Sequence, residues 1–355
     1  MSDVVLQVED LSIGFASEAE PGGTSGNAAV QTVTAITDRV NFELRRGEVL
    51  GLVGESGCGK TVTALALLRL LPSPGGRILG GRIQFQGRDI LSLDHDDMRK
   101  LRGGEISMIF QEPSAALNPL MTIEGQLFEV FAYHDLSEAP GVQSPDKRVR
   151  ELLARVGFAD PDRILKSYPH QLSGGMLQRV VIAMALLLKP AIVIADEPTT
   201  ALDVTVQAQI MELLVELQRE EGTSVLLITH NLGLIAQYAE RLAVMYAGRI
   251  VEDAPVESFL NRAHHPYSEG LLAALPDVTR QKRLQPIDGQ VPRPADYDDG
   301  CRFRDRCHRR SEVQPLTQCE ERPRLLPLEA DAGREVACWL HAGAQAEPES
   351  TESSK

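Results

Sequence analysis

Short apolar runs alternate along this chain with longer segments in which apolar residues recur at helical spacing. The runs at 48–54, 191–196 and 224–229 are each followed by polar residues, as is typical of strands buried on both faces of a parallel sheet. Residues 60–71 and 178–188 have the periodicity of helices. Strands that alternate with helices in this way predict an α/β fold.

Three further segments, 4–15, 32–46 and 80–90, have strand-like patterning. Residues 92–170 are richer in helix formers and in charge, and they predict a helical block inserted between strands. The stretch 16–31 is small, polar and contains Pro and Gly, so we expect a flexible surface loop there.

Beyond residue 256 the apolar pattern weakens and prolines become more frequent. Four of the five cysteines lie in the last 55 residues. The final stretch is small, polar and acidic, which is typical of a disordered tail. We therefore expect three parts: a core over 1–255, a cysteine-containing region over 256–341, and a tail over 342–355.

Composition narrows the class of protein. An apolar share of 43% in 355 residues is enough for a large core. The net charge of −14 argues against a protein whose main role is to bind nucleic acid or an anionic membrane surface. No secretory signal is visible. The longest apolar run, 180–188, is far shorter than the ~20 residues needed to span a bilayer. We expect a soluble, cytosolic protein whose thiols stay reduced.

The stretch GESGCGKT at 54–61 fits the phosphate-binding P-loop pattern. Its glycines allow backbone N–H groups to point at phosphate oxygens, and the next helix offers its positive end to the same anion. Lys60 is expected to reach the β- and γ-phosphates, and Thr61 to ligate Mg²⁺. The alternative is a Gly-rich turn before a helix. The predicted nucleotide-binding residues here are Gly54, Glu55, Ser56, Gly57, Cys58, Gly59, Lys60, Thr61 and Val62.

Cys58 stands at the start of this predicted helix. A thiol at a helix N-terminus tends to have a lowered pKa and raised reactivity. We therefore expect alkylation of Cys58 to block nucleotide hydrolysis and bound ATP to protect the thiol.

An acidic pair, Asp196 and Glu197, closes the apolar run at 191–196. An acid at the end of a strand beside a P-loop suits a Mg²⁺ ligand, and Asp196 is our candidate. Glu197 is placed to polarise the attacking water as a general base. In isolation such a pair is more often a helix N-cap.

The stretch LSGGMLQ at 172–178 offers a second helix N-terminus free of bulky side chains. Alone, Ser173 is best interpreted as an ordinary N-cap. The order of motifs gives it more meaning: the P-loop, Gln111 in FQEP, LSGGMLQ, IVIADEP, ALD at 201–203, and His230 in LLITH. This ordered set resembles the nucleotide-binding subunits of ABC (ATP-binding cassette) ATPases, over roughly residues 4–255.

The resemblance implies a P-loop core with an antiparallel β-subdomain and an inserted helical subdomain, about 92–170. It implies that two such domains pair head to tail around two ATP molecules. Catalysis would then involve Lys60, Gln111, Glu197 and His230, with Gln111 also on Mg²⁺. The resemblance further implies that ATP is contacted by Phe15, stacked on adenine, and from the opposing chain by Ser173, Gly174, Gly175, Gln178 and Asp203. A core role is the alternative for Phe15.

Further stretches are similar to one subfamily, the ATPases of oligopeptide, dipeptide and nickel importers. These are GLVGESGCGKT, MIFQEPSAALNP, HHPYSEGLLAALP at 264–276, GCRFRDRC and REVACWLH. The similarity implies a paralogous ATPase subunit as heterodimer partner, two transmembrane permease subunits, and an extracytoplasmic solute-binding protein acting through the permease. It implies a peripheral position at the cytoplasmic face of the inner membrane. Glu112 and the SAALNP that follows are expected to contact the permease.

The four C-terminal cysteines are Cys301, Cys307, Cys319 and Cys338. In the subfamily such a region can hold a [4Fe–4S] cluster, which takes four thiolates. Structural zinc also takes four cysteines, but usually through paired C-x₂₋₄-C knuckles, which the gaps of five, eleven and eighteen residues lack. Zinc and unligated thiols remain alternatives, because the middle gap is longer than the family pattern and His308 replaces a common Pro.

Subfamily membership favours import of peptides, with nickel or another small solute as the alternative. A soluble ABC ATPase of DNA repair or translation would usually show two cassettes, a coiled coil or a basic surface. This chain has one cassette and an acidic balance. An interaction role for the C-terminal region remains a further alternative.

Overall fold

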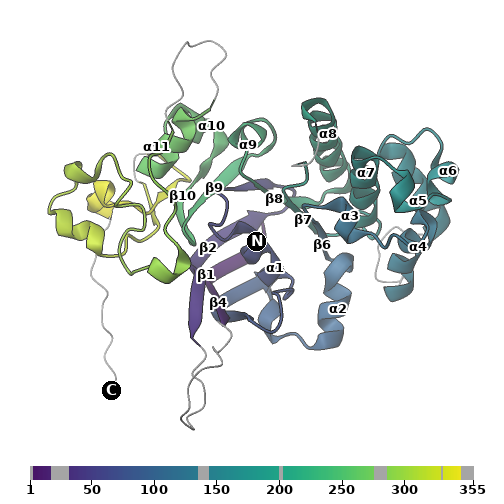
Figure 1. The fold of residues 1–355 in the computed structure, drawn as a ribbon, viewed down its shortest axis with the longest axis horizontal. Helices are drawn as coiled ribbons and strands as arrows, with labels where there is room; N and C mark the ends of the chain where they lie inside the picture. Colours follow the sequence, from purple (N-terminus) through teal and green to yellow (C-terminus); the bar gives the residue numbers. More distant parts are fainter. Residues whose placement is uncertain are drawn as a thin grey trace, which may run out of the picture.

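The computed structural model describes residues 3–16, 32–134, 144–199, 203–275, 286–328 and 331–344. Nearly all of the loop predicted over 16–31, and most of the tail predicted over 342–355, lie outside these residues. Two sheets form the centre of the molecule, a helical lobe lies at one end, and the C-terminal region lies at the opposite end (Figure 1).

The smaller sheet is antiparallel, in the order β2-β1-β4-β5. The larger sheet has the order β11-β12-β10-β9-β3-β8-β7-β6. Its strands from β9 to β6 run parallel, as the apolar runs predicted. The strand bounds are β1 Val4–Ala16, β2 Val33–Arg45, β3 Val49–Val53, β4 Gly76–Phe85, β5 Arg88–Asp89, β6 Ile106–Ile109, β7 Ile192–Asp196, β8 Ser224–Thr229, β9 Arg241–Tyr246, β10 Arg249–Pro255, β11 Leu326–Pro327 and β12 Glu335–Val336.

Helices cover the larger sheet and build the lobe around α4 to α7 (Figure 1). The range predicted as a helical block, 92–170, also contains β6, which joins the large sheet beside β7. The helix bounds are α1 Lys60–Leu67, α2 His95–Gly104, α3 Pro113–Ala116, α4 Ile123–Tyr133, α5 Pro145–Arg155, α6 Pro161–Leu165, α7 Gly174–Ala185, α8 Val204–Glu221, α9 Leu232–Tyr238, α10 Val256–Asn261 and α11 Pro266–Ala273.

The parallel strands are buried on both faces because two separate cores flank them. In β3, Val49 and Val53 pack into the core beneath the helices, while Leu50 and Leu52 pack into the core shared with the smaller sheet. Successive side chains of a strand point to opposite faces, so a strand between two cores must be apolar throughout. This explains why these strands appear in the sequence as unbroken apolar runs.

The C-terminal region packs onto the core of the main domain. Strand β12 pairs with β10 and extends the large sheet. Phe303 is buried against Tyr246 and Tyr267, with ring centroids 5.1 and 5.5 Å away. The weak apolar pattern beyond residue 256 therefore belongs to a region whose few apolar residues pack into the core of the main domain.

Among the helices of the described residues, none is both long and apolar enough to cross a bilayer.

Candidate functional site

The P-loop joins β3 to α1, as the sequence predicted. Gly59 precedes the helix with φ +108°, a conformation that side chains disfavour, and a Cβ there would lie 2.8 Å from Thr37 Cγ2. At Gly54 an added Cβ would lie 2.1 Å from the Met245 carbonyl oxygen. Glycine is therefore required at both positions for the loop to pack tightly against β2 and β9.

Lys60 is held at the centre of the loop. Its side chain is buried, and Nζ donates to the carbonyl oxygens of Gly54, at 2.8 Å, and Glu55, at 3.2 Å. These bonds curl the loop around the ammonium group and place a positive charge where a phosphate would bind.

Thr61 and Asp196 meet at the ends of α1 and β7. The Thr61 hydroxyl donates to Asp196 Oδ1 over 3.2 Å, and Asp196 is only 2% exposed. Burial, with a smaller contribution from the neighbouring Glu197 charge, raises the pKa of Asp196. A buried carboxylate beside a hydroxyl is a ligand set that fits Mg²⁺. The positive charge of the ion would offset the free-energy cost of burying the carboxylate charge.

Glu197 connects the remaining predicted catalytic residues. Its Oε1 lies 3.0 Å from His230 Nδ1, and its Oε2 accepts a bond of 3.4 Å from Gln111 Nε2. Glu197 has a φ of +45°, a left-handed conformation that is costly for a non-glycine residue and is concentrated at functional sites. The residues line a cavity of about 410 Å³: Ile36, Ser56, Gly57, Gly59, Lys60, Thr61, Val62, Gln111, Glu197 and His230.

Comparison with known proteins decides the family. The family model described as "ABC transporter" matches residues 37–200, and "Oligopeptide/dipeptide transporter, C-terminal region" matches 251–313. The chain is 42% identical to the oligopeptide transport ATP-binding protein AppD of Bacillus subtilis, over 95% of this chain and 97% of that protein. It belongs to the ATP-binding subunits of oligopeptide and dipeptide ABC transporters.

Other relatives agree. The chain is 44% identical to the dipeptide transport ATP-binding protein DppD of Bacillus subtilis, over 95% of this chain and 94% of that protein. Among solved structures, the ATP-binding cassette MJ0796, a dimer bound to ADP and Pi, is 26% identical with a TM-score of 0.57. That match covers 71% of this chain and 98% of that chain. The predicted ABC fold is confirmed, and the protein is an ATPase.

The residues of LSGGMLQ and Asp203, which are expected to contact ATP of an opposing chain, lie away from the ATP cavity of their own chain. Ser173 caps α7, where its hydroxyl accepts from Met176 N over 3.4 Å, and it is exposed. Gly174, Gly175 and the buried Gln178 follow on the same helix. Asp203 caps α8 and is also exposed. None of these residues lines the cavity around Lys60.

The predicted adenine-stacking residue also lies outside this cavity. Phe15 is in β1, opposite Thr34 of β2, and its ring lies near Gly76. The residue that β2 does contribute to the cavity is Ile36, which motif matching did not single out. Its position follows from strand register and has no signal in the sequence. The stacking role of Phe15 stays a prediction.

The expectation of a reactive Cys58 is wrong. The side chain is 0% exposed and belongs to the apolar core between the two sheets. Burial raises the pKa of the Cys58 thiol, and the nearby Lys60 charge only partly opposes this. Only backbone atoms of Cys58 are thus available to a nucleotide.

Two functional contacts to the P-loop come from residues more than 200 positions away. The backbone N–H of Glu55 donates to the hydroxyl of Tyr267 over 2.9 Å, and the Glu55 carboxylate lies 3.1 Å from Arg306 Nη1. Tyr267 lies in the first turn of α11, and Arg306 lies within CRFRDRC. Sequence reasoning missed both residues, because neither belongs to a motif of the ATP site.

The four C-terminal cysteines are all free thiols. Cys301 N donates to the Cys319 carbonyl oxygen over 2.9 Å. Burial, with smaller contributions from the charges of other cysteines, raises the pKa of Cys301 to about 11 and that of Cys338 to about 12. Within the described residues, no group of three or more His, Cys, Asp or Glu side chains is arranged to hold a metal ion. The described residues thus give the predicted iron–sulfur site no support.

Proposed function

We propose that this ATPase powers the import of peptides across the bacterial inner membrane through a pair of permease subunits. The ATP cavity that joins Lys60, Thr61, Glu197 and His230 carries the proposal, together with the peptide and dipeptide names of the relatives. The ordered motifs and the C-terminal family match both point to the same subfamily.

Within each site we assign four roles. Lys60 binds the β- and γ-phosphates, Thr61 and Asp196 hold Mg²⁺, and Glu197 takes the proton of the attacking water. His230 lies 3.0 Å from Glu197 and orients that carboxylate. Mg²⁺, when bound, neutralises charge that develops on the transferred phosphate. The remaining donors come from this chain's own P-loop backbone.

A complete site requires a second cassette. Ser173 and Asp203 are exposed and lie outside the cavity of their own chain, where an opposing chain would meet them. The helix that Ser173 caps would then present its positive end to the other chain's γ-phosphate. We propose a paralogous ATPase as that second chain, because members of the subfamily work as unlike pairs.

A groove beside the helical lobe is our proposed permease-binding site. It has a volume of about 590 Å³ and lies between β6, α4 and α7. Phe110 and Tyr133 line it and are 38% and 65% exposed, and Ala116 and Asn118 of the SAALNP stretch line it too. An apolar groove with a polar rim suits a short helix of a transmembrane partner. This contact would hold the ATPase at the inner face of the membrane, with the solute-binding protein on the other side.

We propose a [4Fe–4S] cluster on Cys301, Cys307, Cys319 and Cys338 from the residue types and from the effect of the other three thiols on the pKa of Cys338. The thiolate forms of these cysteines repel one another, which raises the pKa of Cys338. A metal cluster binds thiolates, and its positive charge would offset this repulsion. Protein purified without oxygen should absorb blue light and contain equal amounts of iron and sulfide. A colourless protein that contains zinc, or neither metal, would contradict the cluster.

The transport proposal is tested in vesicles that contain the permease pair, this ATPase and its paralogue. A peptide presented with the solute-binding protein should stimulate ATP hydrolysis and accumulate inside the vesicles. Matched samples receive nickel in place of peptide. Stimulation by nickel alone would assign the alternative cargo, and a stable complex with DNA or ribosomes would contradict transport.

A further inference from the structure

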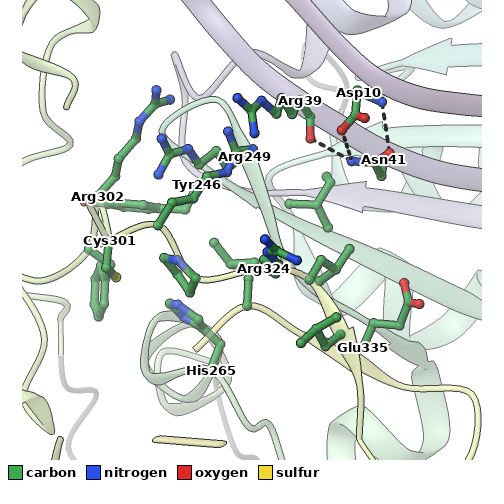
Figure 2. A pocket seen from close by; sticks show the side chains of 18 residues that line it. Asp10, Arg39, Asn41, Tyr246, Arg249, His265, Cys301, Arg302, Arg324 and Glu335 are labelled. Carbon is green, nitrogen blue, oxygen red and sulfur yellow. Dashed lines mark hydrogen bonds between the residues drawn. The ribbon is translucent and has the colours of Figure 1, made fainter. Parts of the chain in front are cut away.

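A second large cavity lies where the small sheet and the edge of the large sheet meet the C-terminal region. Its volume is about 640 Å³, and its lining shares no residue with the ATP cavity. Figure 2 shows side chains from β2, β9, β10 and the C-terminal segments entering it from several sides.

Arginine dominates the charge of this cavity. Two acidic residues, Asp10 and Glu335, are in the lining, and Asp10 is engaged with Asn41 over 3.2 Å. Five arginines are in the same lining: Arg39, Arg249, Arg302, Arg322 and Arg324. The cavity therefore has an excess of positive charge in a chain whose net charge is −14.

Three of these arginines share one carboxylate as their ion-pair partner. Asp38 lies 2.7 Å from Arg249 Nη2, 3.2 Å from Arg302 Nη2 and 2.9 Å from Arg322 Nη1. A single negative charge cannot balance three guanidinium groups. Burial lowers the pKa of Arg322, and the like charge of Arg249 lowers it further.

Arg302 has a hydrogen-bond donor that no described residue of the protein uses. Its side chain is 7% exposed, and its two Nη atoms donate to Ala247 O and to Asp38. Its Nε is buried and has no hydrogen-bond partner among the residues that the structure describes. A buried unpaired donor is rare in native proteins and costs free energy, so it calls for an explanation. An anion in the cavity would accept from it.

The cavity also has an apolar wall. Leu325 and Leu326 are half-buried and line the same space as the arginines. A volume of about 300–1,000 Å³ with apolar walls and a few convergent polar groups is typical of small-molecule sites. Guanidinium groups are the preferred partners of phosphate because their fork of donors matches its oxygens.

We propose that this cavity binds a small soluble molecule that carries a phosphate group beside a planar or apolar part, such as a nucleoside monophosphate. The arginines bind the phosphate, and the half-buried Leu325 and Leu326 pack against the remainder. The site is separate from ATP hydrolysis and from the transport role proposed above.

The test measures binding directly, in the full chain, with uridine 5′-monophosphate and inorganic phosphate as probes. Calorimetric titration is done in a Lys60→Ala background, so that binding of the probes at the P-loop is weakened. We expect a single site per chain, with the nucleotide bound more tightly than phosphate alone. Because two charged hydrogen-bonding partners are lost, the added pair Arg39→Gln and Arg324→Gln should weaken binding by about tenfold or more.

Arg39 and Arg324 are exposed, so these substitutions leave the buried network around Asp38 in place. The matched control is Arg293→Gln, in the same region but outside the cavity and with a side chain 82% exposed. It should bind both probes as the Lys60→Ala protein does. No binding of either probe, or equal binding with and without Arg39 and Arg324, overturns the proposal. Binding only to phosphatidylglycerol vesicles would overturn the assignment of a soluble ligand.

Discussion

The hydroxyl of Tyr267 is the feature through which we expect the C-terminal region to act on ATP binding. It accepts the N–H of Glu55, inside the P-loop, over 2.9 Å, and the tyrosine is 0% exposed. Tyr267→Phe removes only this acceptor and keeps the ring in its place beside Tyr246, at 4.6 Å, and Phe303. No cavity is created, so the loss is confined to one hydrogen bond.

The size of the effect follows from that single bond. A backbone donor left without its acceptor costs about 1 kcal/mol at a partly buried position. If the bond holds the P-loop in its ATP-binding conformation, that cost appears in the affinity for ATP as a factor of about five. We expect the dissociation constant of a fluorescent ATP analogue, measured by equilibrium titration, to rise by this factor.

The control is Tyr133→Phe, since Tyr133 is 65% exposed in α4 and does not line the cavity around Lys60. It should change neither affinity nor thermal stability. If Tyr267→Phe lowers the unfolding temperature but binds the analogue as tightly as the wild type, the hydroxyl only stabilises the fold. The C-terminal region would then have no influence on the P-loop through this bond.

Three further predictions address catalysis, thiol chemistry and acid stability. Glu197→Gln should retain ATP binding while hydrolysis, measured by phosphate release, falls about a hundredfold or more. Lys60→Ala should instead weaken ATP binding itself. Full turnover by Glu197→Gln would refute the role of Glu197 as general base. Cys58, being buried with a raised pKa, should resist alkylation in the folded protein and react after denaturation, as mass spectrometry of the labelled peptide can show; rapid native labelling would contradict its burial. Burial lowers the pKa of His265 to about 3, so the folded state keeps it neutral while the unfolded state takes up a proton below about pH 6.5, and stability is lost as pH falls through that range. His265→Asn keeps an acceptor for the N–H of Tyr267 and should make the unfolding temperature less dependent on pH between 7 and 5. Asp253, whose pKa burial raises to about 6, makes an opposing contribution, but that contribution is present in both proteins and cancels in the comparison. Identical pH profiles of the two proteins would refute the role of His265.

Much of the fold was predictable because its signals are local. The unbroken apolar runs of β3, β7 and β8 record burial on both faces, and this burial is repeated at every residue of the strand. Glu197, His230 and Lys60 were assigned because each follows a recognisable strand or loop, and the parallel sheet brings those strand ends together. The order of motifs was enough to place them in one site.

Other features depended on which surfaces the folded chain brings together. The position of Cys58 in the P-loop motif suggests a reactive thiol, yet the thiol is buried in the adjoining core. The effect of burial on its pKa is larger than the opposing effects of the helix N-terminus and of Lys60. Arg306 contacts Glu55 across 251 positions of sequence, and nothing local to either residue announces that contact.

The sequence by itself thus determined the ATPase core, because periodicity and motif spacing encode strands, helices and phosphate-binding loops. Only the tertiary structure decided what the C-terminal region does to that core. Its few apolar residues share the core of the main domain, its Tyr267 reaches the P-loop, and its arginines gather around Asp38. Such contacts arise from packing between distant segments, and packing depends on side-chain shape and charge in three dimensions, which no local pattern records.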